Sequence, residues 1–382
     1  MIILGIETSC DETALALIET RGTGTSFECR VMASLIHSQA DLHSPYGGVF
    51  PTLAKREHEK NLPILLEQLL KDHQEKPGVI AVTEGPGLEP ALWTGIVFAE
   101  KLSKEWSVPI IPINHMEGHV VGSLLQSDVP SDTWQTLKVL ETPALAFLVS
   151  GGHTELVKVE VKQQEQVGSI FPRVLRALRW SQSSDPREHA PYLFSYTLLG
   201  QTKDDAVGEA FDKAARLIGL PYPGGPKLSQ MATEARKSGI IPALKLPRPM
   251  ITSGDLNFSF SGLKTAVLYA VRDAEKAGVF DDTFKKGLAR EFEDAAIETL
   301  ETKLRTAVEE TGARTIIVGG GVSANALLRE RLAAVAHEYD ARLYLPSSHI
   351  SGDNALMIAL AGAFHSPVDR ALKAHGTKRL HA

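Results

Sequence analysis

Short apolar runs alternate with longer amphipathic segments along the chain. Runs of strand length occupy residues 78–83 and 109–113, and an amphipathic segment of helix length lies between them at residues 92–106. Strands that alternate with helices are typical of folds in which helices cover a largely parallel sheet. The pattern of the first half therefore predicts an α/β fold.

The second half continues the alternation. We expect amphipathic helices over residues 204–218 and 291–310 and a buried strand over residues 315–318. Three glycines follow this strand, and a helix is expected from about Ala324. Glycine backbone and helix N-terminal amides can approach a phosphate closely, so this loop is a candidate nucleotide cradle.

Two similar turns follow apolar strands in the two halves. The pattern Ser-x-x-x-Thr occurs in residues 6–13 and again in residues 147–154, and an apolar stretch follows each copy. Two halves of similar structure would explain this echo, although a match of two common residues also arises by chance.

Composition indicates the number of domains and the cellular compartment. The chain has 382 residues, 43% hydrophobic and 23% charged, which is enough for buried cores and about two domains. No apolar run reaches the length of a membrane-spanning helix. The start of the chain lacks the features of a secretory or transit peptide, and only Cys10 and Cys29 are cysteines, so we expect a cytoplasmic protein.

The net charge of -6 argues against general affinity for nucleic acid but allows a local basic patch or a basic partner.

Two histidines have the spacing of metal ligands. His115 and His119 are four residues apart, so on a helix both imidazoles share one face and can bind one ion. Asp353, at the start of an expected helix over residues 355–363, could add a carboxylate, leaving open positions that suit iron(II) or zinc. The alternatives are two unrelated histidines and an aspartate that stabilises a helix N-terminus. Met116 stands where a zinc peptidase needs glutamate, so that peptidase motif is absent.

An acidic stripe precedes a glycine-rich turn. Asp205, Glu209 and Asp212 fall on one face of the expected helix, where solvation is the usual explanation. The turn at residues 222–226 could sit against a flat ligand such as a nucleoside, with Asp212 accepting hydrogen bonds from its hydroxyls. No Walker A sequence occurs, and the glycine triplet at residues 319–321 does not match the dinucleotide fingerprint.

Residues 162–196 interrupt the α/β pattern. They are rich in Gln and Ser and carry Arg173, Arg176 and Arg179 at three-residue spacing. We expect a surface insertion, whose arginines either form a basic helix that contacts RNA or a partner, or belong to a solvated face. The same alternatives apply to the basic residues of the tail after His365.

Seven strings of the sequence together resemble one enzyme family: ETSCDET (7–13), HMEGH (115–119), LVSGGHTEL (148–156), DDAVGEAFDKAARLIGLPYPGGP (204–226), FSFSGLKTA (258–266), GGGVSAN (319–325) and SGDNA (351–355). The family is the bacterial TsaD family of tRNA N6-adenosine threonylcarbamoyltransferases. The resemblance extends from residue 7 to about residue 363 and implies the two-lobed actin/hexokinase/Hsp70-like (ASKHA) fold with duplicated RNase H-like cores. The implied parts are an N-terminal lobe (1–140), a C-terminal lobe (141–364) with the insertion at about 162–196, and a tail (365–382).

The resemblance implies a reaction and assigns residues to it. The L-threonylcarbamoyl group would pass from threonylcarbamoyl-AMP to N6 of the adenosine at position 37 of tRNAs that read codons beginning with A, releasing AMP. His115, His119 and Asp353 would hold one divalent metal ion per subunit, Fe²⁺ or Zn²⁺, and Asp11 is a candidate for positioning or activating the attacking amine. The residues implied to bind the acyl-adenylate are Leu148, Val149, Ser150, Gly151, Gly152, Asp212, Gly225 and Asn325.

The resemblance also implies partners and leaves two rival functions. Besides tRNA and threonylcarbamoyl-AMP, we expect a TsaB-like paralogous subunit and a TsaE-like ATPase, and no membrane. An ATP-dependent binding or chaperone-like module of the same fold would turn over nucleotide without acyl transfer. A metallopeptidase would need the glutamate that Met116 replaces. The insertion is longer than the family usually has, and Asn257 stands where an acidic residue is common.

Overall fold

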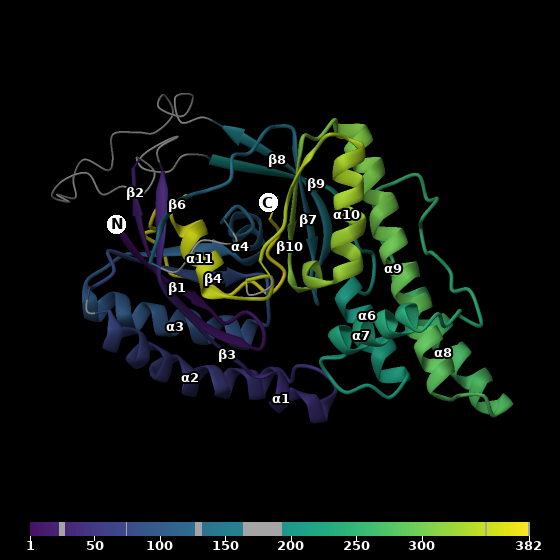
Figure 1. The fold of residues 1–382 in the computed structure, drawn as a ribbon. Helices are drawn as coiled ribbons and strands as arrows, with labels where there is room; N and C mark the ends of the chain where they lie inside the picture. Colours follow the sequence, from purple (N-terminus) through teal and green to yellow (C-terminus); the bar gives the residue numbers. More distant parts are fainter. Residues whose placement is uncertain (23–26, 74, 127–131, 163–192, 348–349, 381–382) are drawn as a thin grey trace.

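The structure is a computed structural model that describes residues 1–22, 27–73, 75–126, 132–162, 193–347 and 350–380 (Figure 1). Its first sheet has six strands in the order β5-β4-β1-β2-β3-β6. β1 pairs antiparallel with β2 and parallel with β4, which pairs parallel with β5. The strands are β1 (Ile2–Glu7), β2 (Glu12–Arg21), β3 (Glu28–Ser38), β4 (Val79–Gly85), β5 (Ile110–Asn114) and β6 (Trp134–Thr136).

The second sheet repeats the topology of the first. Its order is β11-β10-β7-β8-β9, with β7 antiparallel to β8 and parallel to β10. The two turns of similar sequence join equivalent strands, β1 to β2 and β7 to β8, so the duplication that the echo suggested is present in the fold. The strands are β7 (Ala144–Val149), β8 (Thr154–Lys162), β9 (Leu193–Gln201), β10 (Thr315–Gly319) and β11 (Arg342–Tyr344).

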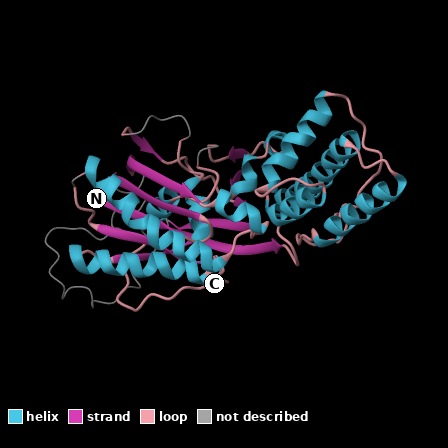
Figure 2. Cartoon of the chain, turned by 90° about the horizontal axis from the view of Figure 1, so that it is seen from below, coloured by secondary structure: helices cyan, strands magenta, loops and turns pink. Residues whose placement is uncertain are grey.

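Helices cover both sheets (Figures 1 and 2). In the first half they are α1 (Ala40–His43), the 3-10 turn η2 (Ser44–Tyr46), α2 (Pro51–Asp72), α3 (Glu89–Trp106) and α4 (His115–Gly122). In the second half they are α6 (Val207–Leu217), α7 (Gly224–Lys237), α8 (Ser261–Ala277), α9 (Asp282–Thr311), the 3-10 turn η5 (Gly321–Ala324), α10 (Ala326–Glu338) and α11 (Ala355–Gly362). No helix among the described residues is both long and apolar enough to cross a membrane.

Alternate residues of β1 enter two different cores. Leu4 and Ile6 pack with the helices α2 and α3 on one face of the first sheet. Ile3, on the other face, joins a core that contains α4, α11 and residues of β7 and β10. α11 approaches β1 closely because Gly5 has no side chain: a Cβ there would lie 2.2 Å from the carbonyl oxygen of Ala355. α4 and α11 therefore lie between the two sheets.

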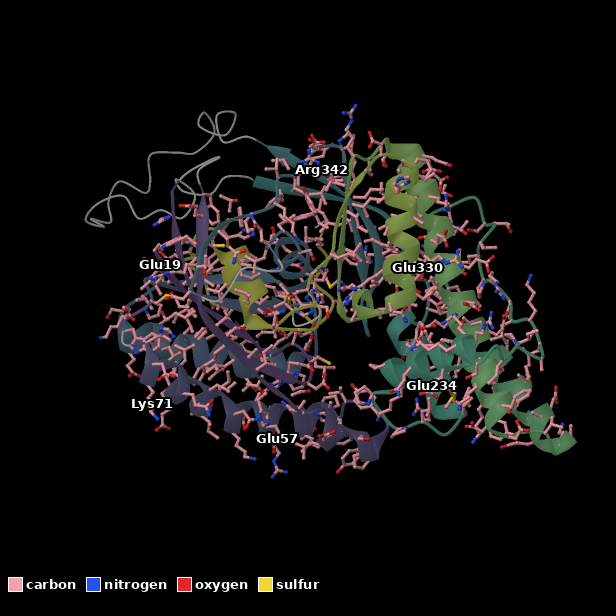
Figure 3. The ribbon with its side chains drawn as sticks, viewed as in Figure 1. Glu19, Glu57, Lys71, Glu234, Glu330 and Arg342 are labelled. Carbon is pink, nitrogen blue, oxygen red and sulfur yellow. The ribbon has the colours of Figure 1, made fainter. Side chains whose placement is uncertain are left out.

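Charged side chains lie on the outer faces of these layers. Lys71 on α2 and Glu330 on α10, both labelled in Figure 3, are exposed. Such side chains keep the outer helix faces hydrated while the opposite faces pack on the sheets.

The expected elements are present with shifted ends. The helix expected over residues 204–218 begins at Val207, because Asp204 instead accepts hydrogen bonds from the amides of Phe260 and Ser261. The helix expected over residues 291–310 begins nine residues earlier, at Asp282, where Asp281 caps it by accepting from the Phe284 amide. The expected strands at residues 78–83 and 109–113 are β4 and β5.

The interruption expected at residues 162–196 is narrower than predicted. β8 continues to Lys162 and β9 begins at Leu193, with Lys162 opposite Leu193 and Val159 opposite Tyr196. Residues 193–196 are therefore part of the second sheet. Arg173, Arg176 and Arg179 lie outside the described residues.

Two of the basic residues of the tail bind a buried carboxylate of the first sheet, while Lys373 and Arg379 are exposed. Arg370 and Lys378 both bind the carboxylate of Glu84, at 2.7 Å and 2.6 Å, and the Glu84 side chain is buried. Glu84 lies near the end of β4, so the tail is held against the first sheet.

Replacing Glu84 by glutamine is expected to reduce the acid sensitivity of folding. Burial alone would raise the pKa of Glu84, but hydrogen bonds from Arg370 and Lys378 outweigh burial and lower it to about 2. The stabilisation is therefore complete above the unfolded-state pKa of about 4.3 and is lost as the pH falls towards 2, roughly 1–3 kcal/mol after allowing for the partly exposed cations. Urea unfolding of both proteins at pH 7 and pH 3 measures this term. Equal losses of stability between these pH values in both proteins would contradict it.

Candidate active site

Helix α4 carries both histidines, His115 at its start and His119 one turn further along. Asn114 ends β5 and caps the helix, because its Oδ1 accepts hydrogen bonds from the amides of Met116 at 2.9 Å and Glu117 at 3.3 Å. His115 and His119 are one turn apart, with ring centroids separated by 4.7 Å. Both side chains are almost fully buried.

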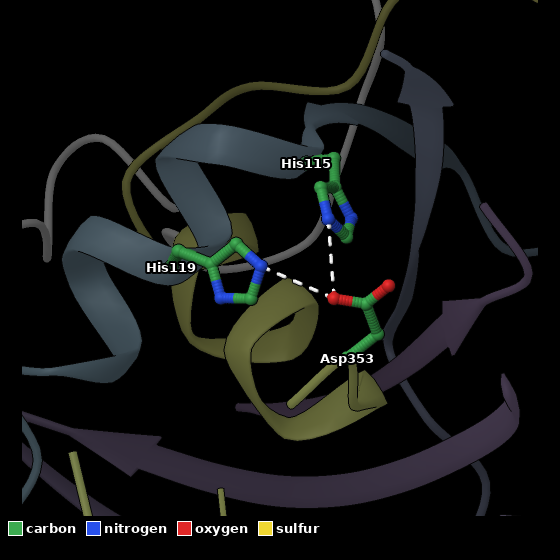
Figure 4. A group of neighbouring side chains, drawn as sticks. All are labelled: His115, His119 and Asp353. Atoms are coloured by element: carbon green, nitrogen blue, oxygen red, sulfur yellow. Dashed lines mark ion pairs between the residues drawn. The ribbon is translucent and has the colours of Figure 1, made fainter. Parts of the chain in front are cut away.

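Asp353 reaches the two histidines from a different part of the chain. It precedes α11, whose cap Asn354 accepts from the Met357 amide at 3.0 Å. Its Oδ1 lies 3.3 Å from His115 Nε2 and 3.2 Å from His119 Nε2 (Figure 4). One ligand atom from each of the three residues lies within 4.8 Å of the others, so the structure brings the three predicted metal ligands together.

The donor set fits a transition metal or zinc. His119 Nε2 is buried and makes no hydrogen bond. The other nitrogen of His115, Nδ1, lies 3.2 Å from Ser9 Oγ and 3.1 Å from Glu7 Oε2, which directs Nε2 towards Asp353. Two imidazole nitrogens and one carboxylate oxygen suit iron(II) or zinc, and a carboxylate behind a ligating histidine is the usual support in such sites.

The electrostatics of the group favour a cation. Burial would lower the pKa of His115, but Asp353 and Glu7 outweigh burial and raise it well above its ordinary value. Burial would raise the pKa of Asp353, but His115 and His119 lower it. The buried carboxylates thus attract positive charge to the space between the imidazoles, and a divalent ion meets the same preference.

Asp11 lies in the turn between β1 and β2. It is almost fully buried, and Tyr222 of the second half donates a hydrogen bond to its Oδ2 at 3.4 Å. Burial and the charges of Asp11 and Asp353 raise the pKa of the neighbouring Glu12 well above its ordinary value. The turn is therefore a compact acidic group close to the predicted metal ligands.

The predicted substrate loop ends β7 and turns into β8. The side chains of Leu148 and Val149 are completely buried, so only their backbone could contact a ligand. Ser150 Oγ shapes the turn by accepting from the amides of Gly152 at 3.3 Å and His153 at 3.0 Å. Gly151 and Gly152 are exposed, and a Cβ on either would meet nothing within 4 Å. Their backbone is open to a ligand.

The residues predicted to bind the adenylate form a second group. Asp212 Oδ1 accepts from the amides of Gly224 at 2.8 Å and Gly225 at 2.9 Å, so these glycines form the first turn of α7 rather than a separate loop. Asn325 caps α10, and its Nδ2 donates to Ser229 Oγ on α7 at 2.8 Å. A cavity of about 310 Å³ adjoins Asp212. Residues from both halves line it: Ser44, Pro45, Tyr46, Gly47, Asp212, Arg216, Leu220, Pro221 and Tyr222.

The prediction that three acidic residues share one face of the helix is wrong for Asp205. Asp205 precedes α6 rather than lying on it, and Lys213 binds both Asp205 at 2.7 Å and Glu209 at 2.9 Å. Asp212 faces α7 instead. Only Asp212 of the three therefore belongs to the predicted adenylate group.

The glycine triplet connects the two groups. A Cβ on Gly319 would lie 2.9 Å from His119 Cβ, and one on Gly320 would lie 2.5 Å from the carbonyl oxygen of Val149. The end of β10 thus packs against α4 on one side and the predicted substrate loop on the other. Asn325 follows four residues after Gly321.

Comparisons with known proteins identify the family. A family model described as TsaD, tRNA N6-adenosine threonylcarbamoyltransferase, matches residues 30–189 and 183–360. The chain belongs to this family. The protein of that name from Methylobacillus flagellatus is 42% identical over 367 residues, covering 95% of this chain and 92% of the relative. The one from Paraburkholderia xenovorans is 42% identical over 366 residues, with coverage of 95% and 92%. These names favour neither the chaperone-like nor the peptidase alternative.

Solved structures support the fold. Full-length HypF in its phosphate- and nucleotide-bound form matches with a TM-score of 0.50 at 13% identity, covering 95% of this chain and 46% of HypF. HypF from T. kodakarensis also gives a TM-score of 0.50, at 14% identity, covering 95% of this chain and 47% of that protein. At such low sequence identity, these matches support similarity of fold alone. With the duplicated sheet topology, they confirm the predicted two-lobed actin/hexokinase/Hsp70-like architecture.

Sequence reasoning missed three residues of this TsaD family member. Glu7, completely buried at the end of β1, supports His115 and accepts a hydrogen bond from Thr83 Oγ1. His153 lies near the predicted metal ligands, and its pKa is lowered to about 4 by burial and by the charges of His115 and His119. Glu12 belongs to the acidic turn. All three stand inside the quoted strings, and Glu12 and His153 directly follow predicted residues. For Glu7 the available signal was an ionisable residue at the end of a buried strand.

Proposed function

We propose that this chain transfers the L-threonylcarbamoyl group from threonylcarbamoyl-AMP to N6 of the adenosine at position 37 of tRNAs that read codons beginning with A. The tRNA substrate follows from membership of the TsaD family. The observation that carries the proposal is the convergence of His115, His119 and Asp353 from α4 and the start of α11. A tRNA substrate also supports the expected cytoplasmic location.

The protein mainly has to position the two substrates for this reaction, because the donor is already activated as a mixed anhydride. N6 forms a bond to the carbamoyl carbon, the bond from that carbon to the phosphate oxygen breaks, and AMP leaves. Asp11 would orient the amine and receive its proton. The open backbone of Gly151 and Gly152 would lie along the donor, and the group of Asp212, Gly225 and Asn325 would hold its adenylate part.

We propose one divalent ion per subunit, Fe²⁺ or Zn²⁺, held by His115, His119 and Asp353. When bound, the ion would supply Lewis acidity that polarises the acyl-adenylate. Glu7 would keep His115 Nδ1 engaged so that Nε2 faces the ion.

Nucleoside mass spectrometry tests the function. Unmodified tRNA would be incubated with threonylcarbamoyl-AMP, the protein, the expected partners and ATP, and digested to nucleosides. We expect threonylcarbamoyladenosine and an equal amount of AMP with an A37 transcript. A matched transcript with guanosine at position 37 should yield none. No product from folded, metal-loaded protein with its partners would overturn the proposal.

We further propose a TsaB-like paralogous subunit and a TsaE-like ATPase as partners. A groove between α2 and α3 offers a partly apolar contact surface for the paralogous subunit. It is lined by Leu62, Trp93, Val97 and Phe98 together with Lys55, Glu59, Thr94 and Lys101. Trp93 and Val97 are 42% and 58% exposed, which is unusual for adjacent large apolar side chains unless a partner covers them.

Replacing Trp93 by glutamate is expected to weaken association with the TsaB-like subunit at least tenfold, because a charge would be buried against apolar groups. Titration calorimetry with the purified subunit measures this. Tyr269→Glu, on the exposed face of α8, is the control and should bind as wild type. Equal affinity of Trp93→Glu and wild type would place the contact elsewhere.

A further inference from the structure

We propose that residues 365–380, the C-terminal strap, hold helix α4 in the position that presents His115 and His119 to Asp353. The strap residues act as positioning residues and do not themselves touch the reacting groups. This inference rests on the proposed metal site. The strap runs beside α4, where Figure 1 marks the C-terminus.

The strap holds the first turn of α4 through its cap. Asn114 uses Oδ1 to cap the helix and donates from Nδ2 to the carbonyl oxygen of Arg379 at 3.1 Å. The orientation of the Asn114 amide therefore depends on a residue far along the chain. Because His115 is the next residue, a rotation of this cap would move the first predicted metal ligand.

The strap also holds the face of α4 that points away from the proposed metal ligands. His365 Nε2 lies 2.8 Å from Glu117 Oε2, and Tyr196 donates to Glu117 Oε1 at 3.0 Å. Glu117 is buried, so both contacts replace hydration of its carboxylate. α4 is thus fixed from the strap side through Asn114 and Glu117, while its other face carries the histidines.

Glu84 anchors the strap to the first sheet. Arg370 and Lys378 bind its carboxylate, and the His375 amide donates to its backbone oxygen at 2.9 Å. A buried carboxylate with two cations and a backbone contact fixes the strap on both sides of residue 375. This anchor lies close to Arg379 and, together with Leu380, which packs in the core that contains α4, keeps the Arg379 carbonyl beside Asn114.

A second route leads from the strap to His115. The Gly87 amide donates to the carbonyl oxygen of Gly376 at 3.2 Å, and the next amide, of Leu88, donates to the Ser9 oxygen at 2.8 Å. A Cβ on Gly87 would lie 2.6 Å from that Ser9 oxygen, so the loop and the Ser9 turn are in close contact. Ser9 Oγ in turn lies 3.2 Å from His115 Nδ1. Both routes end at the same imidazole.

Glu84→Gln in the full chain tests the inference. It removes the charge that binds Arg370 and Lys378 while keeping the side-chain volume. Hydrogen–deuterium exchange of the amides of residues 115–122, measured without added metal, should become about tenfold faster. The dissociation constant for Zn²⁺, measured by chelator competition, should rise by about tenfold or more, as for other supporting residues of metal sites.

A matched variant separates positioning from general destabilisation. Glu291→Gln removes another buried carboxylate, which binds Arg248 and the Leu246 amide on the far side of the second lobe. It should leave both the exchange of residues 115–122 and the zinc affinity at wild-type values. If both variants behave alike, or if Glu84→Gln changes neither quantity, the strap only stabilises the fold and the inference is wrong.

Asn114→Ser provides a test should Glu84→Gln fail to fold. Serine retains a helix cap but lacks the amide donor that reaches Arg379. The same rise in exchange and in the zinc dissociation constant is expected, and wild-type values would overturn the inference. His115→Ala identifies failure of the metal site itself: if its zinc stoichiometry equals that of wild type, the proposed ligands are wrong, whatever the strap variants do.

Discussion

Asp353→Ala is expected to abolish stoichiometric metal binding and to lower threonylcarbamoyl transfer by about a thousandfold or more, equivalent to roughly 4 kcal/mol of transition-state stabilisation. The substitution removes the carboxylate oxygen that lies within 3.3 Å of both imidazole Nε2 atoms. Only two neutral donors would remain, too few for a stable site. Elemental analysis of the purified variant and nucleoside mass spectrometry of the product measure the two losses.

The control for this substitution is Asp273→Ala, which removes an exposed carboxylate from α8. It should retain wild-type metal content and activity. If Asp353→Ala kept its metal, the carboxylate would not be a ligand. If it lost the metal but kept full activity, the ion would have a structural role and the catalytic assignment would fall on Asp11 and the substrate loop alone.

The repeated pattern of strands and the helix that carries two of the proposed metal ligands could be predicted from the sequence. Each depends on local signals: apolar runs marked β4, β5 and β10, and the four-residue spacing of His115 and His119 placed them on one helical face. The link to Asp353 needed the family resemblance, because nothing local relates residues that are more than two hundred positions apart. The structure supplies that contact by packing α11 beside α4.

Residues that act through long-range contacts could not be predicted in this way. In the sequence, Glu84 is a polar residue at the end of a strand, and Arg370 and Lys378 are basic residues of the tail. Only the fold shows that they bind one another. The end of a helix also depends on such contacts. Asp204 leaves the expected helix because it accepts hydrogen bonds from residues more than fifty positions away. Periodicity describes which face of an element is buried but not which polar partner it meets.

Gly320→Ala is the second substitution with a large expected effect. Gly320 has a φ of +92°, which L side chains rarely adopt, and an added Cβ would lie 2.5 Å from the carbonyl oxygen of Val149. Backbone strain and this contact should lower the free energy of unfolding by about 2–4 kcal/mol. The end of β10 and the turn after β7 must also separate, which would raise the KM for threonylcarbamoyl-AMP by about tenfold or more, because that turn is the predicted substrate loop.

The neighbouring residue offers a close control. Gly321 has an ordinary φ, and a Cβ there would meet nothing within 4 Å, so Gly321→Ala should change stability by no more than about 0.5 kcal/mol and leave the KM unchanged. Urea unfolding and steady-state kinetics on both variants make the comparison. A loss of stability in Gly320→Ala with an unchanged KM would show that the strand ends can part without moving the donor, and would contradict the assignment of the Val149 backbone to the substrate loop. Equal behaviour of the two variants would mean that the close approach of β10 to β7 is not needed for either folding or binding.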